Sequence, residues 1–304
     1  MFIHTDNYTQ TQLFDSTIEA SVQPSLPPLK GQLLKWIGNK QKFATEIIYN
    51  FPKSFGTYFE PFVGSGAVLA KLAPKQAVAG DSFKPLIEIW TKLHDDTDAL
   101  IEWYAERYAL IAKLGKQEAY SQVLASYNAG ANGADLLFLS RVCYGGVVRF
   151  RKSDGYMSTP CGPHKPMPPE NFADRARIWA ARTRSARFQH ADFAETMKQA
   201  KAGDMVYLDP PYVDSQAILY GAQGFSYPRL LESIADCKKR GVYVALSIDG
   251  TKKSGGKTVE LPTIEGLFER QVMVRLGSSM LKRYQLKDQT AEGHYVEDRL
   301  LLTY

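Results

Sequence analysis

Four consecutive residues, Asp209-Pro210-Pro211-Tyr212, are of the types that can hold an exocyclic amine for reaction. They follow the apolar run 205–208, which predicts a strand, so they are expected at its carboxyl end. The Asp209 carboxylate and a proline-fixed carbonyl can each accept an N–H hydrogen bond, and the Tyr212 ring can stack on a base. The nitrogen lone pair is then free to attack an electrophile, as amino methylation requires. Taken alone, the tetrapeptide also fits a strand that ends in a proline-stiffened turn.

A second candidate site is the stretch Phe-Glu-Pro-Phe-Val-Gly-Ser-Gly at 59–66, which precedes a helical pattern at 67–72. Gly64 and Gly66, after Phe62, permit a sharp turn and close approach of a ligand to the strand end. A plain strand-to-helix turn explains the same residues, because the full dinucleotide-binding and Walker patterns are absent. The next predicted strand, 76–80, ends in Asp81, where an acid commonly holds a ribose hydroxyl.

The order of these parts, with Lys-Trp-Ile-Gly-Asn-Lys at 35–40 in front, resembles the Dam-type DNA adenine-N6 methyltransferases, the D12 class or alpha group. The resemblance covers about residues 31–304. It implies an α/β fold with a Rossmann-like S-adenosylmethionine-dependent methyltransferase sheet and an inserted, mainly helical target-recognition domain. It also implies S-adenosyl-L-methionine as methyl donor, S-adenosyl-L-homocysteine as product and no metal.

The same resemblance assigns roles to single positions. The residues that it assigns to the cofactor side are Trp36, Lys40, Phe62, Gly64, Gly66, Asp81, Asp192, Phe193 and Asp209. The residues that it assigns to catalysis are Asp209, Pro210, Pro211 and Tyr212. The implied reaction is direct methyl transfer to an adenine that is flipped out of the duplex and stacked on Tyr212. Asp209 and the Pro210 carbonyl then orient the amine and share its developing positive charge.

Composition agrees with this interpretation without proving it. The 304 residues are 44% hydrophobic, and a net charge of +5 is compatible with a polyanionic partner. Three cysteines without metal-ligand spacing and a polar N-terminus without a signal-peptide pattern favour a reducing cytoplasm. The family resemblance implies a DNA-associated protein encoded by a bacterium or a phage. The five histidines also lack metal-ligand spacing, and no apolar run is long enough to span a membrane.

Periodicity predicts the elements that must position these residues. Helical patterns cover 83–93, 98–109, 134–144 and 170–185, and strand patterns cover 205–208, 243–247, 272–276 and 298–303. The last two strands are expected to form an antiparallel pair at the sheet edge. We therefore expect an N-terminal arm at 1–30, a catalytic domain formed by 31–95 and 188–304, and a target-recognition insertion at 96–187.

The insertion carries the positive charge of the chain. Residues 141–190 contain ten Lys or Arg and three Asp or Glu, a balance of +7 against +5 for the whole chain. A solvated face is the plain alternative, but arginines interleaved with aromatics and glycines favour DNA contact. Residues 147–156 predict a β-hairpin with an Asp-Gly turn. The predicted DNA-binding residues are Arg141, Tyr144, Arg149, Arg151, Lys152, His164 and Lys165.

Two positions of the insertion depart from the family pattern. Gly145 stands where Dam-type enzymes have Asn, and Pro163 replaces a second base-reading arginine, which leaves a GATC target in doubt. Double-stranded DNA is the expected partner, with a cognate restriction endonuclease left open, and a monomer or weak dimer is expected. The rival interpretations are a catalytically silent DNA-binding subunit and an amino-methyltransferase acting on cytosine N4, RNA or a protein amide.

Overall fold

The computed structural model describes residues 26–151, 153–211, 225–249, 264–276 and 296–304. Two residues predicted to act in the site, Tyr212 and Lys152, lie outside this described part, as does the N-terminal arm up to residue 25.

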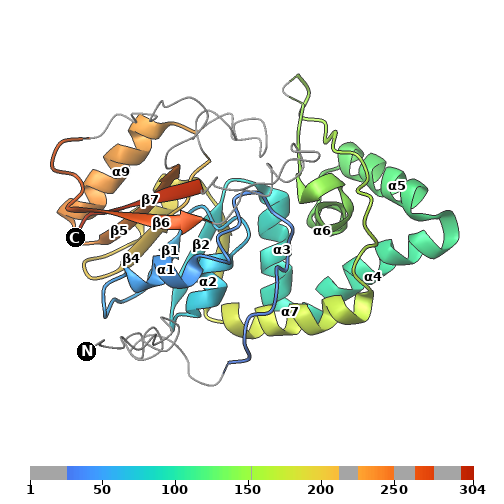
Figure 1. The fold of residues 1–304 in the computed structure, drawn as a ribbon, viewed down its shortest axis with the longest axis horizontal. Coiled ribbons are helices and arrows are strands. Elements are labelled where there is room, and N and C mark those ends of the chain that lie inside the picture. The colour runs from blue at the N-terminus through green and yellow to red at the C-terminus, as the bar shows by residue number, and fades with distance from the viewer. Residues whose placement is uncertain (1–25, 152, 212–224, 250–263, 277–295) are drawn as a thin grey trace, which may run out of the picture.

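One seven-stranded sheet forms the centre of the protein (Figure 1). The strands are β1 (Tyr58–Glu60), β2 (Ala77–Asp81), β3 (Ala186–His190), β4 (Met205–Leu208), β5 (Tyr243–Asp249), β6 (Arg270–Leu276) and β7 (Val296–Leu302). Their order across the sheet is β3-β2-β1-β4-β5-β7-β6. The pairs from β3 to β5 are parallel, whereas β7 runs antiparallel to both β5 and β6. The antiparallel pair predicted at the sheet edge is confirmed.

The central strands β1 and β4 are buried on both faces, which is why β4 is a continuous apolar run and β1 is apolar except for Glu60. Alternate residues nevertheless pack into different cores, because successive side chains of a strand point to opposite faces. Tyr58 and Tyr207 join the larger core, with α1, α2 and α3, whereas Phe59 and Val206 join the smaller one, with α8 and α9. The sheet is therefore covered by helices on both sides.

The helices fall into two groups. Around the sheet lie α1 (Ala44–Tyr49), α2 (Ala67–Leu72), α3 (Lys84–Asp95), α8 (Phe193–Lys198) and α9 (Tyr227–Lys239). Beside it, to the right of α3 in Figure 1, lie α4 (Thr97–Leu114), α5 (Lys116–Ala129) and α6 (Gly133–Val142), and α7 (Pro169–Thr183) runs below α3. A 3-10 turn, η1 (Tyr144–Gly146), follows α6. The second group shares the larger core with the sheet, as the contact of Trp90 in α3 with Trp179 in α7 illustrates.

Five predicted helices are confirmed as α2, α3, α4, α6 and α7, and α4 continues five residues beyond its predicted end. The sequence did not predict β3, although it pairs with β2 over five residues. Its residues Ala-Arg-Phe-Gln-His include exposed polar positions, which an edge strand tolerates and a buried strand does not. The sequence also missed α5, whose buried stripe is only four residues.

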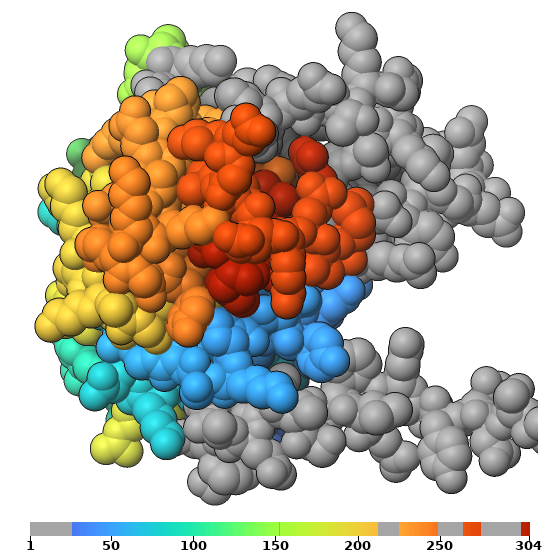
Figure 2. Space-filling view, turned by 90° about the vertical axis from the view of Figure 1, so that its left-hand side faces the viewer, coloured from blue at the N-terminus to red at the C-terminus, as the bar shows by residue number. Residues whose placement is uncertain are grey.

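The C-terminal strands close the fold against its beginning. Figure 2 shows β6 and β7 directly above the segment around α1 on the face turned to the viewer. The Tyr304 hydroxyl donates to the Asn50 carbonyl at 3.0 Å, immediately after α1. The Thr303 N–H donates to the Val244 carbonyl at 3.0 Å, which continues the pairing of β7 with β5 past its end. These bonds fix the end of β7 against β5 and against the residue that follows α1.

Candidate active site

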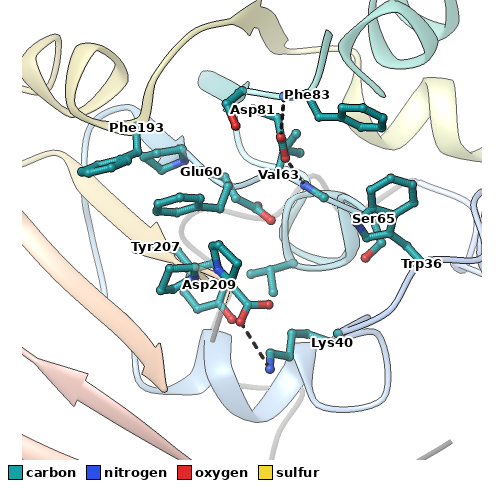
Figure 3. A pocket seen from close by; sticks show the side chains of 18 of the residues that line it. Trp36, Lys40, Glu60, Val63, Ser65, Asp81, Phe83, Phe193, Tyr207 and Asp209 are labelled. Atoms are coloured by element: carbon teal, nitrogen blue, oxygen red, sulfur yellow. Dashed lines mark hydrogen bonds and ion pairs between the residues drawn. The ribbon is translucent and has the colours of Figure 1, made fainter. Parts of the chain in front are cut away.

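A cavity of about 290 Å³ opens at the carboxyl ends of β1, β2 and β4. The strand order places these ends side by side, which is where open α/β sheets bind their ligands. Residues from distant parts of the sequence therefore meet in the cavity, including Trp36, Glu60, Asp81, Asp192 and Asp209 (Figure 3). The predicted cofactor-side residues and the described part of the catalytic tetrapeptide line this one cavity, except that Gly66 lies at the start of α2 behind it.

The glycine turn between β1 and α2 is rigid and tightly packed. Gly64 and Gly66 have φ of 45° and 62°, a region that side chains rarely adopt. The Trp90 indole N–H donates to the Gly64 carbonyl at 3.0 Å. A Cβ on Gly66 would lie 2.8 Å from the Trp90 ring, so this ring leaves no room for a side chain. The turn thus needs glycine for conformation at both positions and for space at the second.

Asp81 at the end of β2 faces the glycine turn. One carboxylate oxygen accepts the Gly64 N–H at 3.2 Å and the other accepts the Phe83 N–H at 3.0 Å. Desolvation in the pocket raises the pKa of the Asp81 carboxyl group to about 6, against the opposing effect of these bonds. Each oxygen keeps a further lone pair, so the carboxylate can still accept from ligand hydroxyl groups.

Asp209, directly after β4, forms an ion pair with Lys40 (Figure 3). The Nζ and Oδ1 atoms are 3.3 Å apart, and the two side chains are 7% and 18% exposed. An opposite charge at this distance favours the ionised carboxylate, which accepts hydrogen bonds only. Pro210 and Pro211 line the same cavity. Lys40, expected from the sequence on the cofactor side, is thereby a direct neighbour of the carboxylate predicted to be catalytic.

The segment that precedes Trp36 and Lys40 is held in place by Arg141, near the end of α6. The Arg141 guanidinium donates to the carbonyls of Gln32 and Leu33 at 3.1 and 2.6 Å. It also lies over the Phe172 ring, 5.6 Å from its centre. This enclosed position differs from the DNA-facing one that the sequence predicts for Arg141.

A wall of three phenylalanine rings closes the α8 side of the cavity. Phe62 stacks on Phe193 with centroids 5.3 Å apart, and Phe225 contacts both rings at 5.9 Å. Asp192 caps α8 by accepting the Ala194 N–H at 2.9 Å. Arg229 of α9 binds the same carboxylate with two N–H groups, at 2.5 and 3.0 Å. Asp192 and Phe193 are therefore fixed in place at the cavity wall.

Sequence reasoning missed Glu60, which lines the cavity and is 3% exposed. Desolvation raises the pKa of the Glu60 carboxyl group to about 8, opposed by a hydrogen bond that the Tyr58 hydroxyl donates to Oε2 at 2.7 Å. The neighbouring charge of Asp209 raises the pKa further. The signal in the sequence was an acid inside an otherwise apolar strand. Phe225 and Arg229 carried no such signal. They lie far along the chain from Phe62 and Asp192, and only the fold brings them into contact with these residues.

The predicted hairpin of the insertion is confirmed in a short form. Phe150 and Met157 form an antiparallel bridge, and the Arg151 N–H donates to the Tyr156 carbonyl at 2.9 Å. The Phe150 ring contacts Phe83 of the cavity wall, with centroids 5.6 Å apart. The hairpin therefore begins beside the cavity. The predicted DNA-binding residues whose side chains are exposed are Tyr144, Arg149, Arg151, His164 and Lys165.

Among the described residues, no three His, Cys, Asp or Glu side chains lie together as a metal ion would require. No helix in the same part of the chain combines the length and apolar character needed to cross a membrane.

Comparisons with known proteins agree with this geometry. The Type II methyltransferase M1.LlaDCHI of Lactococcus lactis subsp. cremoris is 28% identical over 232 residues, 70% of this chain and 79% of that protein. The retron Ec67 DNA adenine methylase of Escherichia coli is 31% identical over 64% of this chain and 67% of its own length. The DNA N-6-adenine-methyltransferase of Escherichia phage P1 is 27% identical over 77% of this chain and 32% of that protein. The profile of the D12 class N6 adenine-specific DNA methyltransferases matches residues 36–276, and the chain belongs to this family of enzymes.

Proposed function

We propose that the cavity binds S-adenosylmethionine beside a flipped adenine and that the enzyme methylates this adenine at N6 in duplex DNA. The observation that carries the proposal is the convergence of Asp81, the glycine turn and the Lys40–Asp209 pair in one cavity. The residues present fit the cofactor, because a carboxylate with free lone pairs, a backbone without side chains and a wall of aromatic rings surround one space. When bound, the cofactor supplies an electrophilic methyl group on its sulfonium.

The cofactor side of the cavity is formed by residues with separable tasks. Asp81 accepts hydrogen bonds from the ribose hydroxyls. Asp192 accepts the exocyclic N–H of the cofactor adenine, whose ring packs beside Phe193. Gly64 lets the backbone approach the ligand closely. The remaining residues assigned to this side are Trp36, Lys40 and Phe62, whereas Gly66 shapes the turn without lining the cavity.

The target side is formed by the catalytic tetrapeptide. The Asp209 carboxylate and the Pro210 carbonyl accept the two N–H groups of the flipped adenine, and Pro211 stiffens the backbone that presents them. Lys40 keeps the carboxylate ionised and oriented, so that it stabilises positive charge developing on the amine. Tyr212, by its place in the tetrapeptide, supplies the stacking surface for the base.

Duplex DNA is bound by the insertion, residues 96–187, next to the catalytic domain formed by 31–95 and 188–304. Exposed Arg149, Arg151, His164 and Lys165 support this assignment, because they surround a hairpin that begins at the cavity wall. Arg151 pairs with Asp154 at 2.8 Å and lies 4.2 Å from the centre of the Tyr156 ring, and these two contacts hold its guanidinium at the hairpin tip. A cognate restriction endonuclease is a further proposed partner.

The test is methylation of mixed-sequence DNA with isotopically labelled cofactor, followed by mass spectrometry of the nucleosides and single-molecule mapping of modified sites. We expect label in N6-methyladenine at one recurring sequence. Asp209→Ala should abolish this signal while cofactor binding and the unfolding transition persist, since the lost contact acts mainly in the transition state. Label in N4-methylcytosine, or only in RNA or protein, would reject the proposed acceptor, and binding of DNA without any transfer would indicate a silent subunit.

A further inference from the structure

Residues 157–165, which follow the hairpin, expose side chains from a backbone that is itself enclosed. Pro163, His164 and Lys165 are exposed, whereas the neighbouring Gly162 is buried. A Cβ on Gly162 would lie 2.9 Å from the carbonyl oxygens of Val142 and Cys143, so the chain is pressed against the end of α6. The backbone of this segment is thus packed against α6, whereas the side chains at 163–165 are exposed to solvent.

The ammonium group of Lys116, in the first turn of α5, binds three successive backbone carbonyl groups of this segment. Its Nζ lies 2.7 Å from the oxygen of Gly162, 3.0 Å from that of Pro163 and 3.3 Å from that of His164. A lysine ammonium has three N–H donors, so the three carbonyls match its full capacity. Hydrogen bonds with an ionised donor are roughly twice as strong as neutral ones.

Two other residues of α5 bind the same segment closer to the hairpin, at residues 157 and 159. The Tyr120 hydroxyl, one helical turn after Lys116, donates to the Thr159 carbonyl at 2.6 Å. The Asn128 amide pairs with both the N–H and the carbonyl of Met157, at 2.7 and 3.1 Å. Side chains of α5 thereby satisfy backbone groups that a neighbouring strand would satisfy in a sheet.

The hydrogen-bond network that fixes this segment reaches the backbone of Arg149 through the Thr159 side chain. The Thr159 hydroxyl accepts the Arg149 N–H at 2.9 Å and donates to the Val147 carbonyl at 2.8 Å. The exposed side chains at 149, 164 and 165 therefore project from backbones that are tied to one another and to α5.

We propose that Lys116 is a positioning residue for DNA sequence recognition, which it serves by fixing the backbone of 162–164 rather than by binding phosphate. The inference rests on the proposed function, because it concerns how the insertion discriminates among DNA sequences. Base reading requires side chains placed to within a fraction of an ångström, so a loose backbone loses cognate contacts before non-specific ones. The Lys116 charge is already engaged by carbonyls, so its removal leaves the phosphate contacts of the protein unchanged.

The experiment compares Lys116→Met with Lys113→Met, which removes an equal charge from an exposed residue three positions earlier. DNA affinity is measured at several salt concentrations on the duplex identified by methylation mapping and on a scrambled duplex. We expect Lys116→Met to weaken cognate binding at least about tenfold and scrambled binding little, with an unchanged slope of log K against log salt. Lys113→Met should leave the ratio of the two affinities as in the wild type.

A direct phosphate contact predicts a different result, in which both duplexes weaken equally and the slope falls by about 0.9. That outcome, or a wild-type ratio of affinities in Lys116→Met, overturns the inference. Lys116→Gln, a more polar replacement, serves as a second variant, and cofactor affinity within about twofold of wild type shows that the fold is retained.

Hydrogen exchange of the DNA-free protein separates this inference from the proposed function. Peptides that cover 159–165 should exchange faster in Lys116→Met than in the wild type or in Lys113→Met, because the carbonyl contacts hold the Gly162 N–H against the Val142 carbonyl at 2.8 Å. Unchanged exchange would refute the positioning role even in an active enzyme. Absence of methylation by the wild type would refute the proposed function and leave the exchange result to be judged alone.

Discussion

Lys40 and Asp209 form the ion pair on which the proposed chemistry depends. Burying either charge alone is costly, because a desolvated ion without a partner loses its hydration. Removing one partner of a buried ion pair destabilises a protein by on the order of 3–5 kcal/mol. The pair is retained at 7% and 18% exposure, in the cavity and not in the core. Its position in the cavity supports the proposed role of an ionised Asp209 carboxylate.

Lys40→Met should therefore lower the rate of methyl transfer more than it lowers cofactor affinity. The methionine keeps the length of the side chain but leaves Asp209 without the cation at 3.3 Å. We expect kcat to fall at least about tenfold, which corresponds to about 1.4 kcal/mol of transition-state stabilisation. Single-turnover kinetics and cofactor titration measure the two effects separately. A variant that loses only cofactor affinity would return Lys40 to a purely cofactor-binding role.

The two glycines of the turn after β1 make different demands, which allows a matched comparison. A Cβ on Gly64 would first meet Trp36 at 3.5 Å, an ordinary contact, whereas a Cβ on Gly66 would meet the Trp90 ring at 2.8 Å. Trp90 is 0% exposed and packed against Trp179, so it cannot move aside without disturbing the core.

Gly66→Ala should consequently destabilise the protein more than Gly64→Ala does. Both pay about 1–2 kcal/mol for a positive φ, and the first adds about 1–3 kcal/mol of overpacking. Urea unfolding of the two variants without cofactor gives the difference directly. Equal free energies of unfolding would show that the Trp90 contact relaxes at no cost.

At the scale of elements, Cys143 after α6 faces Cys161 across an antiparallel bridge. The flanking bonds run from the Tyr144 N–H to the Pro160 carbonyl and from the Gly162 N–H to the Val142 carbonyl, both at 2.8 Å. The two cysteines are therefore a non-hydrogen-bonded pair, in which Cα atoms lie about 4.5 Å apart, within the range that a disulfide spans. Both thiols are free in this structure.

We predict that a thiol oxidant such as diamide cross-links Cys143 to Cys161 within one molecule. Burial raises the pKa of Cys143 to about 12 and also raises the pKa of Cys161. Because the thiolate reacts and its fraction grows about tenfold per pH unit below the pKa, cross-linking should be slow near neutral pH and faster as the pH rises. Peptide mapping after alkylation detects the product, and Cys161→Ser is the control. Alkylation of Cys161 without any cross-link at high pH would contradict the predicted register.

At the scale of the whole molecule, the buried acid Glu60 links the cavity to the stability of the fold. The pKa of Glu60 is raised from 4.5 to about 8, so the folded state binds this proton more tightly than the unfolded chain does. The proton's contribution to stability is fully present below pH 4.5 and is lost as the pH rises through about 8. Tyr58, whose hydroxyl binds Glu60, keeps the group enclosed at the end of β1.

Glu60→Gln, which cannot ionise, should escape this loss. We expect the free energy of unfolding of the variant, relative to wild type, to increase from about pH 5 to about pH 8.5, by an amount on the order of a few kcal/mol. Urea titrations without cofactor at both pH values measure the change, and Glu118→Gln, an exposed acid on α5, is the control. A constant difference between variant and wild type would mean that Glu60 is ionised throughout.

Much of the fold was predictable because local patterns and global burial agree. The strand at 205–208 matches β4 residue for residue, since a continuous apolar run is what a strand covered on both faces requires. The motif at 35–40, the glycine turn and the tetrapeptide can each be recognised from their residue types. The site was therefore foreseen as a set of residues, and their convergence in one cavity supports that prediction without testing each role.

The sequence by itself indicated the chemistry through three motifs in one order, at 35–40, 59–66 and 209–212, because each of the last two alone also fits a plain turn. Only the tertiary structure decided the partners of those residues. It places Lys40 on Asp209, Arg229 on Asp192 and Arg141 under the segment before Trp36. The physical reason is that these contacts join residues separated by tens to more than a hundred positions, and side-chain pairing at such separations is set by how strands and helices pack, which no local pattern encodes.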